Sequence, residues 1–155
     1  MSAAFTVRRG GDRDFAFVLD LGLRTVGDSV SALRPAPAEL ARIAYQRLVE
    51  FVREQSHVVL IAESAVEPLG FLLLLDSLPD EVTGLPQAFV AYMAVEPHAR
   101  RGGVGRALLG AAEALARERG LPHFSLMVTE DNAPARQLYA QAGYATERRL
   151  LSKTL

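Results

Sequence analysis

A turn that carries three glycines and three arginines separates an apolar run from a helical run, and it limits the fold more than any other part of this chain. The turn spans residues 100–106, with glycine at positions 102, 103 and 105. Glycine lets main-chain N–H groups approach a ligand because no Cβ stands in the way. The first turn of a helix adds unpaired N–H groups and the positive end of the helix dipole. The segment therefore predicts a site for phosphate or pyrophosphate.

Three phosphate-binding patterns follow a strand in this way, and two of them do not fit. A P-loop requires Lys-Ser or Lys-Thr directly after its glycines, and neither pair occurs at this point. A dinucleotide-binding turn requires Gly-x-Gly-x-x-Gly; Gly103 and Gly105 fit the first two places, but Leu108 occupies the third. The sequence is left with the pattern Arg100-x-x-Gly103-x-Gly105.

Hydrophobic periodicity predicts the elements on both sides of this turn. Strands are expected where apolar or β-branched residues alternate or cluster, over 5–7, 58–62, 70–75, 88–95 and 124–128. Helices are expected from Asp12, from Ala38, over 104–120 and over 132–142, and terminal β structure is expected within 144–155. The order β-α-α-β-β-β-α-β-α-β indicates an α/β domain of mixed, α+β type.

Two further expectations concern the side chains that face the core. The helix from Ala38 is expected to bury one stripe, formed by Leu40, Ile43, Ala44, Leu48 and Phe51. The strand over 88–95 is expected to alternate strictly, with Phe89, Ala91, Met93 and Val95 on one face and Val90, Tyr92 and Ala94 on the other.

Composition limits the partners. The 155 residues fit a single domain over 1–155, and the net charge of −1 provides no basic field for nucleic acid. Cysteine is absent, which excludes thiol catalysis, and the histidines at 57, 98 and 123 are not spaced as a metal site, so no metal is expected. We expect a cytoplasmic protein without a membrane partner, because the N-terminus lacks a signal-type apolar run and the run over 69–75 is too short to span a bilayer.

A second block extends the glycine pattern. It reads Asn132-Ala133-Pro134-Ala135-Arg136-Gln137-Leu138-Tyr139 and is followed by Gly143-Tyr144. Together the two blocks resemble the coenzyme A-binding motifs of the GNAT superfamily of acyl-CoA-dependent N-acyltransferases. The resemblance covers essentially the whole chain, with its specific motifs confined to residues 93–144. It implies a central, mostly antiparallel sheet with flanking helices, in which the strands over 88–95 and 124–129 run parallel and splay apart.

The same resemblance implies acetyl-CoA as co-substrate and a place for each part of it. Backbone groups of Met93 and Val95 are expected to meet the acyl carbonyl and the pantetheine arm at a bulge in the strand. The N–H groups of residues 101–106 are expected to hold the pyrophosphate, while Arg100 and Arg106 either add charge there or cover the helix end in solvent. The complete cofactor-binding set comprises Met93, Ala94, Val95, Arg100, Arg101, Gly102, Gly103, Val104, Gly105, Arg106, Asn132, Ala135 and Tyr139.

The resemblance assigns the catalytic role to Tyr139. Asn132 and Tyr139 are seven residues apart, close to two helical turns, so they lie on one helix face. In the family the asparagine position contacts the cofactor, and the tyrosine donates a proton to the departing thiolate. A phenol is a suitable acid for a thiolate within hydrogen-bond reach. The alternative for Tyr139 is a core aromatic, and Asn132 is either only a helix cap or both a cap and a cofactor contact.

A general base is missing from the strand that leads into the turn. Many relatives place a carboxylate there, but the inward candidates Phe89, Ala91 and Met93 cannot accept a proton. Carboxylates occur near strand ends, at Glu63, Asp76, Glu96, Glu130 and Asp131. We therefore expect deprotonation of the acceptor through water, or an acceptor whose amine is already weakly basic.

These expectations lead to one function and one alternative. The first is acetyl transfer from acetyl-CoA to a primary amine, on a small molecule, peptide or protein, by direct attack in a ternary complex. The acceptor is expected between residues 34–38 and the loop over 77–87, where Asp80 and Glu81 are suited to attract a cation. The alternative is an acyl-CoA-binding sensor or regulatory module with little catalysis. Dimers are frequent in this superfamily, so the resemblance is compatible with a homodimer.

Overall fold

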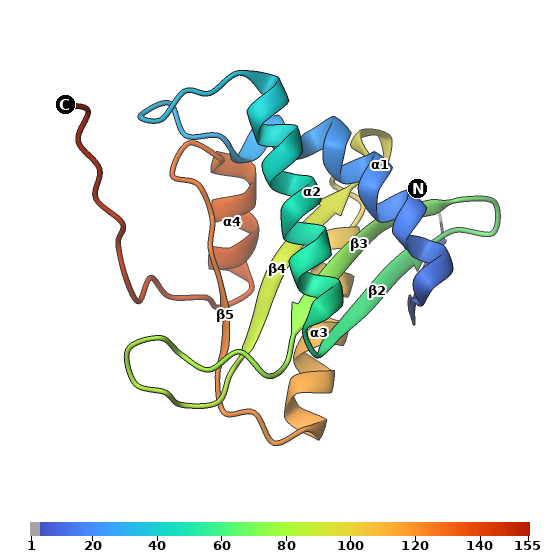
Figure 1. Ribbon diagram of the computed structural model, residues 1–155. Coiled ribbons are helices and arrows are strands. Elements are labelled where there is room, and N and C mark those ends of the chain that lie inside the picture. Colours follow the sequence, from blue (N-terminus) through green and yellow to red (C-terminus); the bar gives the residue numbers. More distant parts are fainter. Residues whose placement is uncertain (1–3) are drawn as a thin grey trace.

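The computed structural model describes residues 4–155 and shows a sheet with helices on both faces (Figure 1). The strands are β1 (Thr6–Arg9), β2 (His57–Glu63), β3 (Pro68–Leu75), β4 (Ala88–Val95) and β5 (Phe124–Leu126). The helices are α1 (Phe15–Thr25), α2 (Ala38–Glu54), α3 (Val104–Glu118) and α4 (Ala133–Gln141), with short 3-10 turns at Asp12–Asp14, Val26–Ser29 and Pro97–Ala99. The predicted order of elements is confirmed as far as α4.

The five strands stand in the sheet in the order in which they occur in the chain. β1 to β4 pair antiparallel, and β5 runs parallel to β4, which confirms the predicted mixed sheet. The parallel pairing comprises only three residue pairs, from Ala88 with Phe124 to Val90 with Leu126. Because β4 continues to Val95, its second half has no strand beside it on this edge of the described sheet. The two strands thus part in the way that the resemblance implies.

The sheet separates two buried clusters. α1 and α2 cover one face and α3 covers the other (Figure 1). Along β2 and β3 successive side chains alternate between the two, so that Leu60 and Leu72 pack with α3 while Ile61 and Phe71 pack with α1 and α2. Coverage of both faces explains why β3 is almost continuously apolar.

The strict alternation expected for β4 is wrong because the strand contains a β-bulge. Leu73 pairs with Tyr92 and Leu74 pairs with Val90, so Ala91 is an extra residue without a partner on β3. Ala91 and Tyr92 therefore both pack on the α1–α2 face, and Met93 packs on the α3 face with Val90. An extra residue shifts every following side chain to the opposite face. The predicted bulge itself is confirmed.

The stripe expected on α2 is rotated. The buried side chains are Tyr45, Val49 and Val52, whereas Leu40 and Phe51 are 57% and 42% exposed. Tyr45 takes the central position because its hydroxyl donates a 2.8 Å hydrogen bond to the carbonyl of Val18 on α1, which lets a polar tip be buried.

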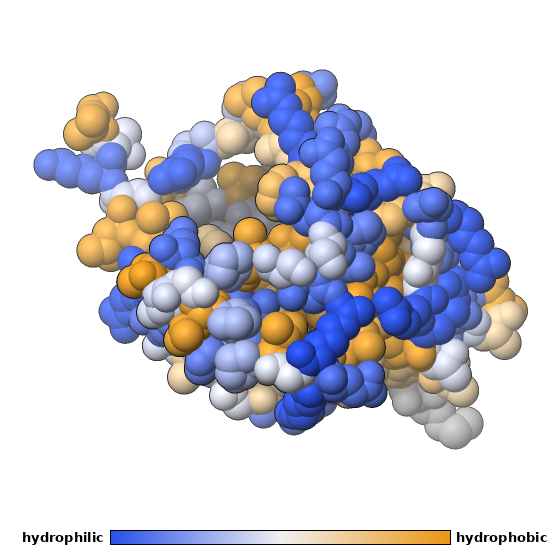
Figure 2. All heavy atoms as spheres, turned by 60° about the horizontal axis from the view of Figure 1, so that its bottom comes forward, coloured by the Kyte–Doolittle hydropathy of each residue, from blue (hydrophilic) through white to orange (hydrophobic). Residues whose placement is uncertain are grey.

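The terminal β structure expected within residues 144–155 is absent. This terminal segment carries no strand and is held by side chains instead. Arg148 forms an ion pair with Asp80 in the β3–β4 loop, and Arg34 in the α1–α2 connection donates to Ser152 Oγ at 3.0 Å. Three consecutive charged residues at 147–149 precede Leu150 and Leu151 in this segment. Figure 2 shows apolar side chains of the segment exposed at the left, in agreement with the high exposure of Leu150 and Leu151.

The described helices offer no candidate for a membrane span, since none combines the required length with the required apolar composition.

Candidate functional site

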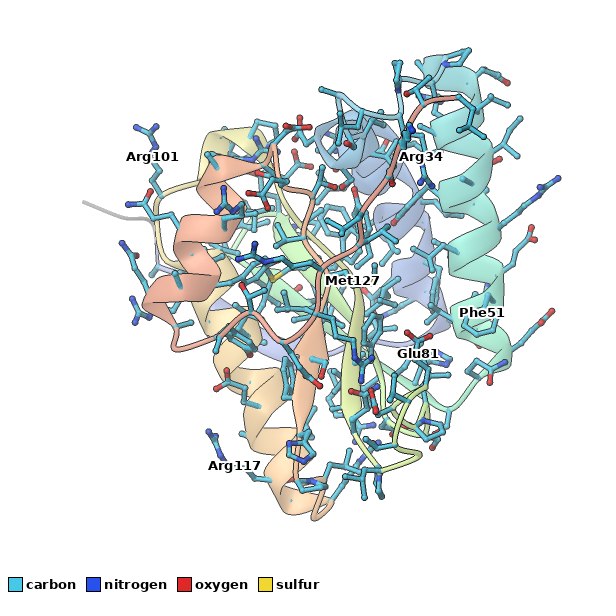
Figure 3. All side chains as sticks on the ribbon, turned by 90° about the vertical axis from the view of Figure 1, so that its left-hand side faces the viewer. Arg34, Phe51, Glu81, Arg101, Arg117 and Met127 are labelled. Atoms are coloured by element: carbon cyan, nitrogen blue, oxygen red, sulfur yellow. The ribbon has the colours of Figure 1, made fainter. Side chains whose placement is uncertain are left out.

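The β4–α3 turn has a backbone shape suited to an anion. Gly103 precedes α3 as its N-cap with a φ of 86°, and Arg101 is also left-handed with a φ of 66°. The left-handed region is unfavourable for a residue with a Cβ, so Arg101 holds strain at this turn. Left-handed residues in such a turn help to aim successive N–H groups at one point, and the first turn of α3 contributes further free N–H groups. Figure 3 shows the Arg101 side chain pointing away from the body of the protein.

The two arginines whose roles were left open both contact the protein. Arg100 donates from Nε to the carbonyl of Val95 and pairs with Asp28 at 3.3 Å, so it links the turn to the α1–α2 connection. Arg106 donates to the carbonyl of Gln141 at 3.4 Å. Both guanidinium groups therefore brace the turn against neighbouring segments, and both side chains remain exposed beside it.

The second sequence block lies directly against the turn. A Cβ added to Gly105 would stand 3.2 Å from Cδ2 of Leu138 on α4 and 3.7 Å from Cε of Met93 on β4. The absence of a side chain at Gly105 thus lets α3, α4 and β4 meet closely. Asn132 caps α4, because its Oδ1 accepts the N–H of Ala135 at 3.3 Å. The cap alternative for Asn132 is therefore confirmed, and the structure brings together the predicted residues of β4, the turn and α4.

Tyr139 is half-buried on α4, with the ring of Tyr144 6.0 Å away in an edge-on arrangement. Burial raises the pKa of Tyr139 above its usual value, and the neighbouring Tyr92 raises this pKa further. A raised pKa keeps the hydroxyl protonated at neutral pH, as a proton donor requires.

Tyr92 is a residue that the sequence did not single out. Its ring packs 4.8 Å from that of Tyr45 and 6.0 Å from that of Phe71. Burial raises the pKa of Tyr92, while the hydroxyls of Thr25 and Ser29 oppose the rise. Tyr92 directly follows the bulge, so it stands where β4 and β5 have parted and within electrostatic reach of Tyr139. The place of Tyr92 beside Tyr139 depends on where the bulge lies in β4, and the sequence alone does not locate the bulge.

Each of the five carboxylates considered as a base has at least one partner within the protein. Glu63 pairs with Arg8, Asp76 with Arg119, Glu96 with Arg24, Glu130 with Arg136, and Asp131 accepts the N–H of Ala32. β4 contains no Asp or Glu, so the bulge turns no carboxylate toward the site. Among residues 4–155, no group of three or more His, Asp or Glu side chains is arranged to hold a metal ion.

A cavity of about 600 Å³, open to solvent, lies between the end of α1, the connection to α2 and the start of α2. Asp131, which precedes α4, also lines it. Arg34 belongs to the region expected to bound the acceptor, and the terminal segment passes from there to the loop that carries Glu81 (Figure 3). Asp80 and Glu81, expected to attract a cation, both pair with Arg148.

The comparisons with known proteins agree with this geometry. A model of the acetyltransferase (GNAT) family matches residues 29–144. Mycothiol acetyltransferase of Saccharomonospora viridis is 40% identical over 68 residues, which cover 44% of this chain and 22% of that protein. The match thus spans about a fifth of the length of this curated relative.

Solved structures show the same fold. A Pyrococcus furiosus protein, provisionally described as an acetyl transferase, is 26% identical with a TM-score of 0.83, covering 98% of this chain and 100% of that one. Ribosomal-protein-alanine N-acetyltransferase of Brucella melitensis biovar Abortus is 21% identical with a TM-score of 0.70, covering 98% of this chain and 99% of that one.

Proposed function

Because the chain belongs to the acetyltransferase (GNAT) family, we propose that it acts as one domain that transfers the acetyl group of acetyl-CoA to a primary amine, by direct attack within a ternary complex. The observation that carries the proposal is the second half of β4, which pairs with β3 but has no strand on its β5 side, beside the glycine turn and Tyr139. β4 offers free main-chain groups there, the turn before α3 offers an anion site, and α4 offers an acid.

The cofactor is held mainly by backbone. Met93, Ala94 and Val95 belong to the part of β4 that β5 leaves without a partner, and the pantetheine amides pair with main-chain groups of Met93 and Val95 as an added strand would. The N–H groups over 101–106 receive the pyrophosphate. Asn132 and Ala135, at the start of α4, complete the proposed cofactor site.

Tyr139 supplies the proton that acyl transfer requires. The amine nitrogen forms a bond to the acetyl carbon, the carbon–sulfur bond breaks, and the hydroxyl of Tyr139 protonates the departing thiolate. The amine gives up its surplus proton to water, and solvent restores the proton of Tyr139. Cysteine is absent from the chain, so a thiol-linked acyl-enzyme does not form.

Water is the proton acceptor because no free carboxylate lies on β4. A lysine-like amine of pKa about 10.4 costs about 4.6 kcal/mol to deprotonate at pH 7, whereas an amine of pKa about 7.8 costs about 1 kcal/mol. Among amines that bind equally well, a weakly basic one therefore reacts faster at neutral pH.

The first prediction tests Tyr139. Acetyl-CoA should raise the melting temperature of the protein, and a suitable amine should then release CoA thiol. Tyr139→Phe should lower kcat about 100-fold with little change in acetyl-CoA affinity, since a missing general acid slows the chemical step. Tyr144→Phe is the matched control, because its hydroxyl bonds to Glu113 on α3, and it should retain kcat.

A sensor is the second candidate, favoured by the missing carboxylate on β4. Binding of acetyl-CoA without thiol release across a broad panel of amines would favour the sensor over the enzyme. Equal kcat for the Tyr139→Phe and Tyr144→Phe variants would instead remove the acid role while leaving the transferase in place.

A further inference from the structure

The cavity beside α1 and α2 has a mainly apolar wall. Most of its lining comes from small or apolar residues, including Leu23, Val26, Gly27, Val30, Pro35 and Ala36. A volume of about 600 Å³ lies within the range of small-molecule sites. Such a wall offers few partners to a hydroxyl-rich ligand, and it favours burial of an alkyl or aryl group.

One carboxylate lines the cavity. Asp131 uses Oδ2 to accept the N–H of Ala32 at 2.8 Å, so the carboxylate is fixed in place while Oδ1 is not used by this bond. Asp131 directly precedes Asn132, the cap of the helix that carries Tyr139. The carboxylate therefore stands on the segment that leads from the cavity to the proposed reaction site.

The surrounding charges disfavour a second or third ammonium group. Arg24 and Arg42 also line the cavity. The other carboxylates near this side are neutralised within the protein: Asp28 by Arg100, Glu96 by Arg24, and Asp80 by Arg148. Arg24 is already paired with Asp20 and Glu96, so a polycation would meet one acidic lining residue, Asp131, and the like charge of Arg42, which repels it.

We propose that this cavity is the acceptor subsite and that the acceptor is a monoamine with a compact apolar group, whose ammonium is held by Asp131. The inference rests on the proposed function. The amine binds as the ammonium at Asp131 and loses its proton to water before attack, while the apolar group remains in the cavity.

The test compares amines at saturating acetyl-CoA by release of CoA thiol. Phenethylamine and isopentylamine represent apolar monoamines, ethanolamine a polar monoamine, and spermidine and kanamycin polycations; the amide of the dipeptide Ala-Phe shows whether a peptide N-terminus is also accepted. The apolar monoamines should exceed ethanolamine and the polycations in kcat/KM by about tenfold or more, as expected for an apolar pocket.

Two variants, each with a matched control, locate the subsite. Asp131→Asn keeps an oxygen for the N–H of Ala32 but removes the charge, and it should raise the amine KM about tenfold while the KM for acetyl-CoA stays constant. Glu130→Gln is its control, since Glu130 pairs with Arg136 instead. Gly27→Leu adds bulk where a Cβ would meet no atom within 4 Å, and it should raise the KM for phenethylamine more than the KM for ethanolamine. Gly110→Leu, an equally open position on α3, should change neither.

Several results would overturn the inference. Preference for spermidine or kanamycin, or an unchanged amine KM in Asp131→Asn, contradicts it while the transferase function stands. Acetyl-CoA binding without turnover of any amine removes the proposed function and the inference together.

Discussion

Asp14 connects the start of α1 to the first strand. Arg8 on β1 pairs with it at 2.9 Å, and its Oδ2 accepts the N–H of Gly11 at 2.8 Å. The hydrogen bond from Arg8 is the main cause that lowers the pKa of Asp14, against the opposing effect of burial. A second contact from Arg8 to Glu63 ties the group to β2. The Asp14 carboxylate thus links the start of α1 to β1 and to the turn at Gly11.

The sign of the pKa shift determines the pH dependence of stability. Because the folded-state pKa of Asp14 is depressed, its contribution is present above the usual carboxyl pKa of about 3.9 and is lost as pH falls through the folded value. Asp14→Asn should reduce the free energy of unfolding by about 1–3 kcal/mol at pH 7 and by less at acidic pH. Urea titrations across this pH range measure the difference. Asp12→Asn, at an exposed site, should change little at any pH. A cost for Asp14→Asn that persists unchanged at low pH would contradict the prediction.

At the same scale, the sequence predicted the residues of the site better than their orientation. The two motif blocks were enough to place Asn132, which caps α4, and to propose Tyr139 as the acid. They were not enough to place Tyr92, because a bulge of one residue leaves no mark in the spacing of apolar side chains. The partners of Asp80 and Asp131 were equally hidden, since both lie far away in the chain.

Between elements, the packing of α1 on α2 depends on one glycine. A Cβ at Gly22 would lie 1.9 Å from Cζ of Tyr45. The Tyr45 ring has little freedom to move, since it is buried and its hydroxyl is bonded to Val18. The same ring supports Tyr92 at 4.8 Å, so the helix contact reaches as far as the bulged strand.

Gly22→Ala should therefore destabilise the protein by about 1–3 kcal/mol through overpacking. Gly11→Ala is the control, because a Cβ there meets no atom within 4 Å. Adding Tyr45→Leu to Gly22→Ala should recover part of the loss caused by Gly22→Ala, since the pair interact directly. Thermal unfolding of the unaltered protein, Gly22→Ala, Tyr45→Leu and the double variant measures the coupling. Strict additivity of the two changes would show that the helices accommodate the methyl group elsewhere.

At the scale of the elements, hydrophobic periodicity predicted the type and order of the helices and strands as far as α4, but not which face of α2 is buried. The apolar period located α2, yet several rotations of that helix bury a similar area. The stripe that contains Tyr45 is the buried one, because Gly22 leaves room for the Tyr45 ring and the carbonyl of Val18 accepts a hydrogen bond from its hydroxyl. Neither partner is visible in the sequence of α2 itself.

Over the whole molecule, the terminal segment joins two distant loops. Arg148 holds it to Asp80 and Glu81, and Ser152 receives a hydrogen bond from Arg34. The sequence predicted terminal β structure here, and the structure has none. The segment instead carries long-range ion pairs, and a single sequence does not reveal such pairs.

Arg148→Gln should free this segment. Chymotrypsin should then cut at Leu150 or Leu151 faster than in the unaltered protein, because the ion pairs with Asp80 and Glu81 no longer restrain the chain. Salt should have the same effect on the unaltered protein, since exposed ion pairs are screened. Arg149→Gln removes an equal charge one residue away and should leave the rate unchanged. Equal cleavage of both variants would show that the segment is held by other contacts.

The three residue pairs between β4 and β5 have a consequence for local unfolding. β5 and α4 are joined to the sheet by far fewer backbone hydrogen bonds than β2 and β3 are, so they form a unit that opens at lower free energy than the remainder. A cofactor bound between β4 and β5 would contact both strands and so raise the free energy of local unfolding of this unit. Amide hydrogen exchange over 124–141 would then report occupancy of the site, while the amides of β2 and β3 would exchange only when the whole domain unfolds.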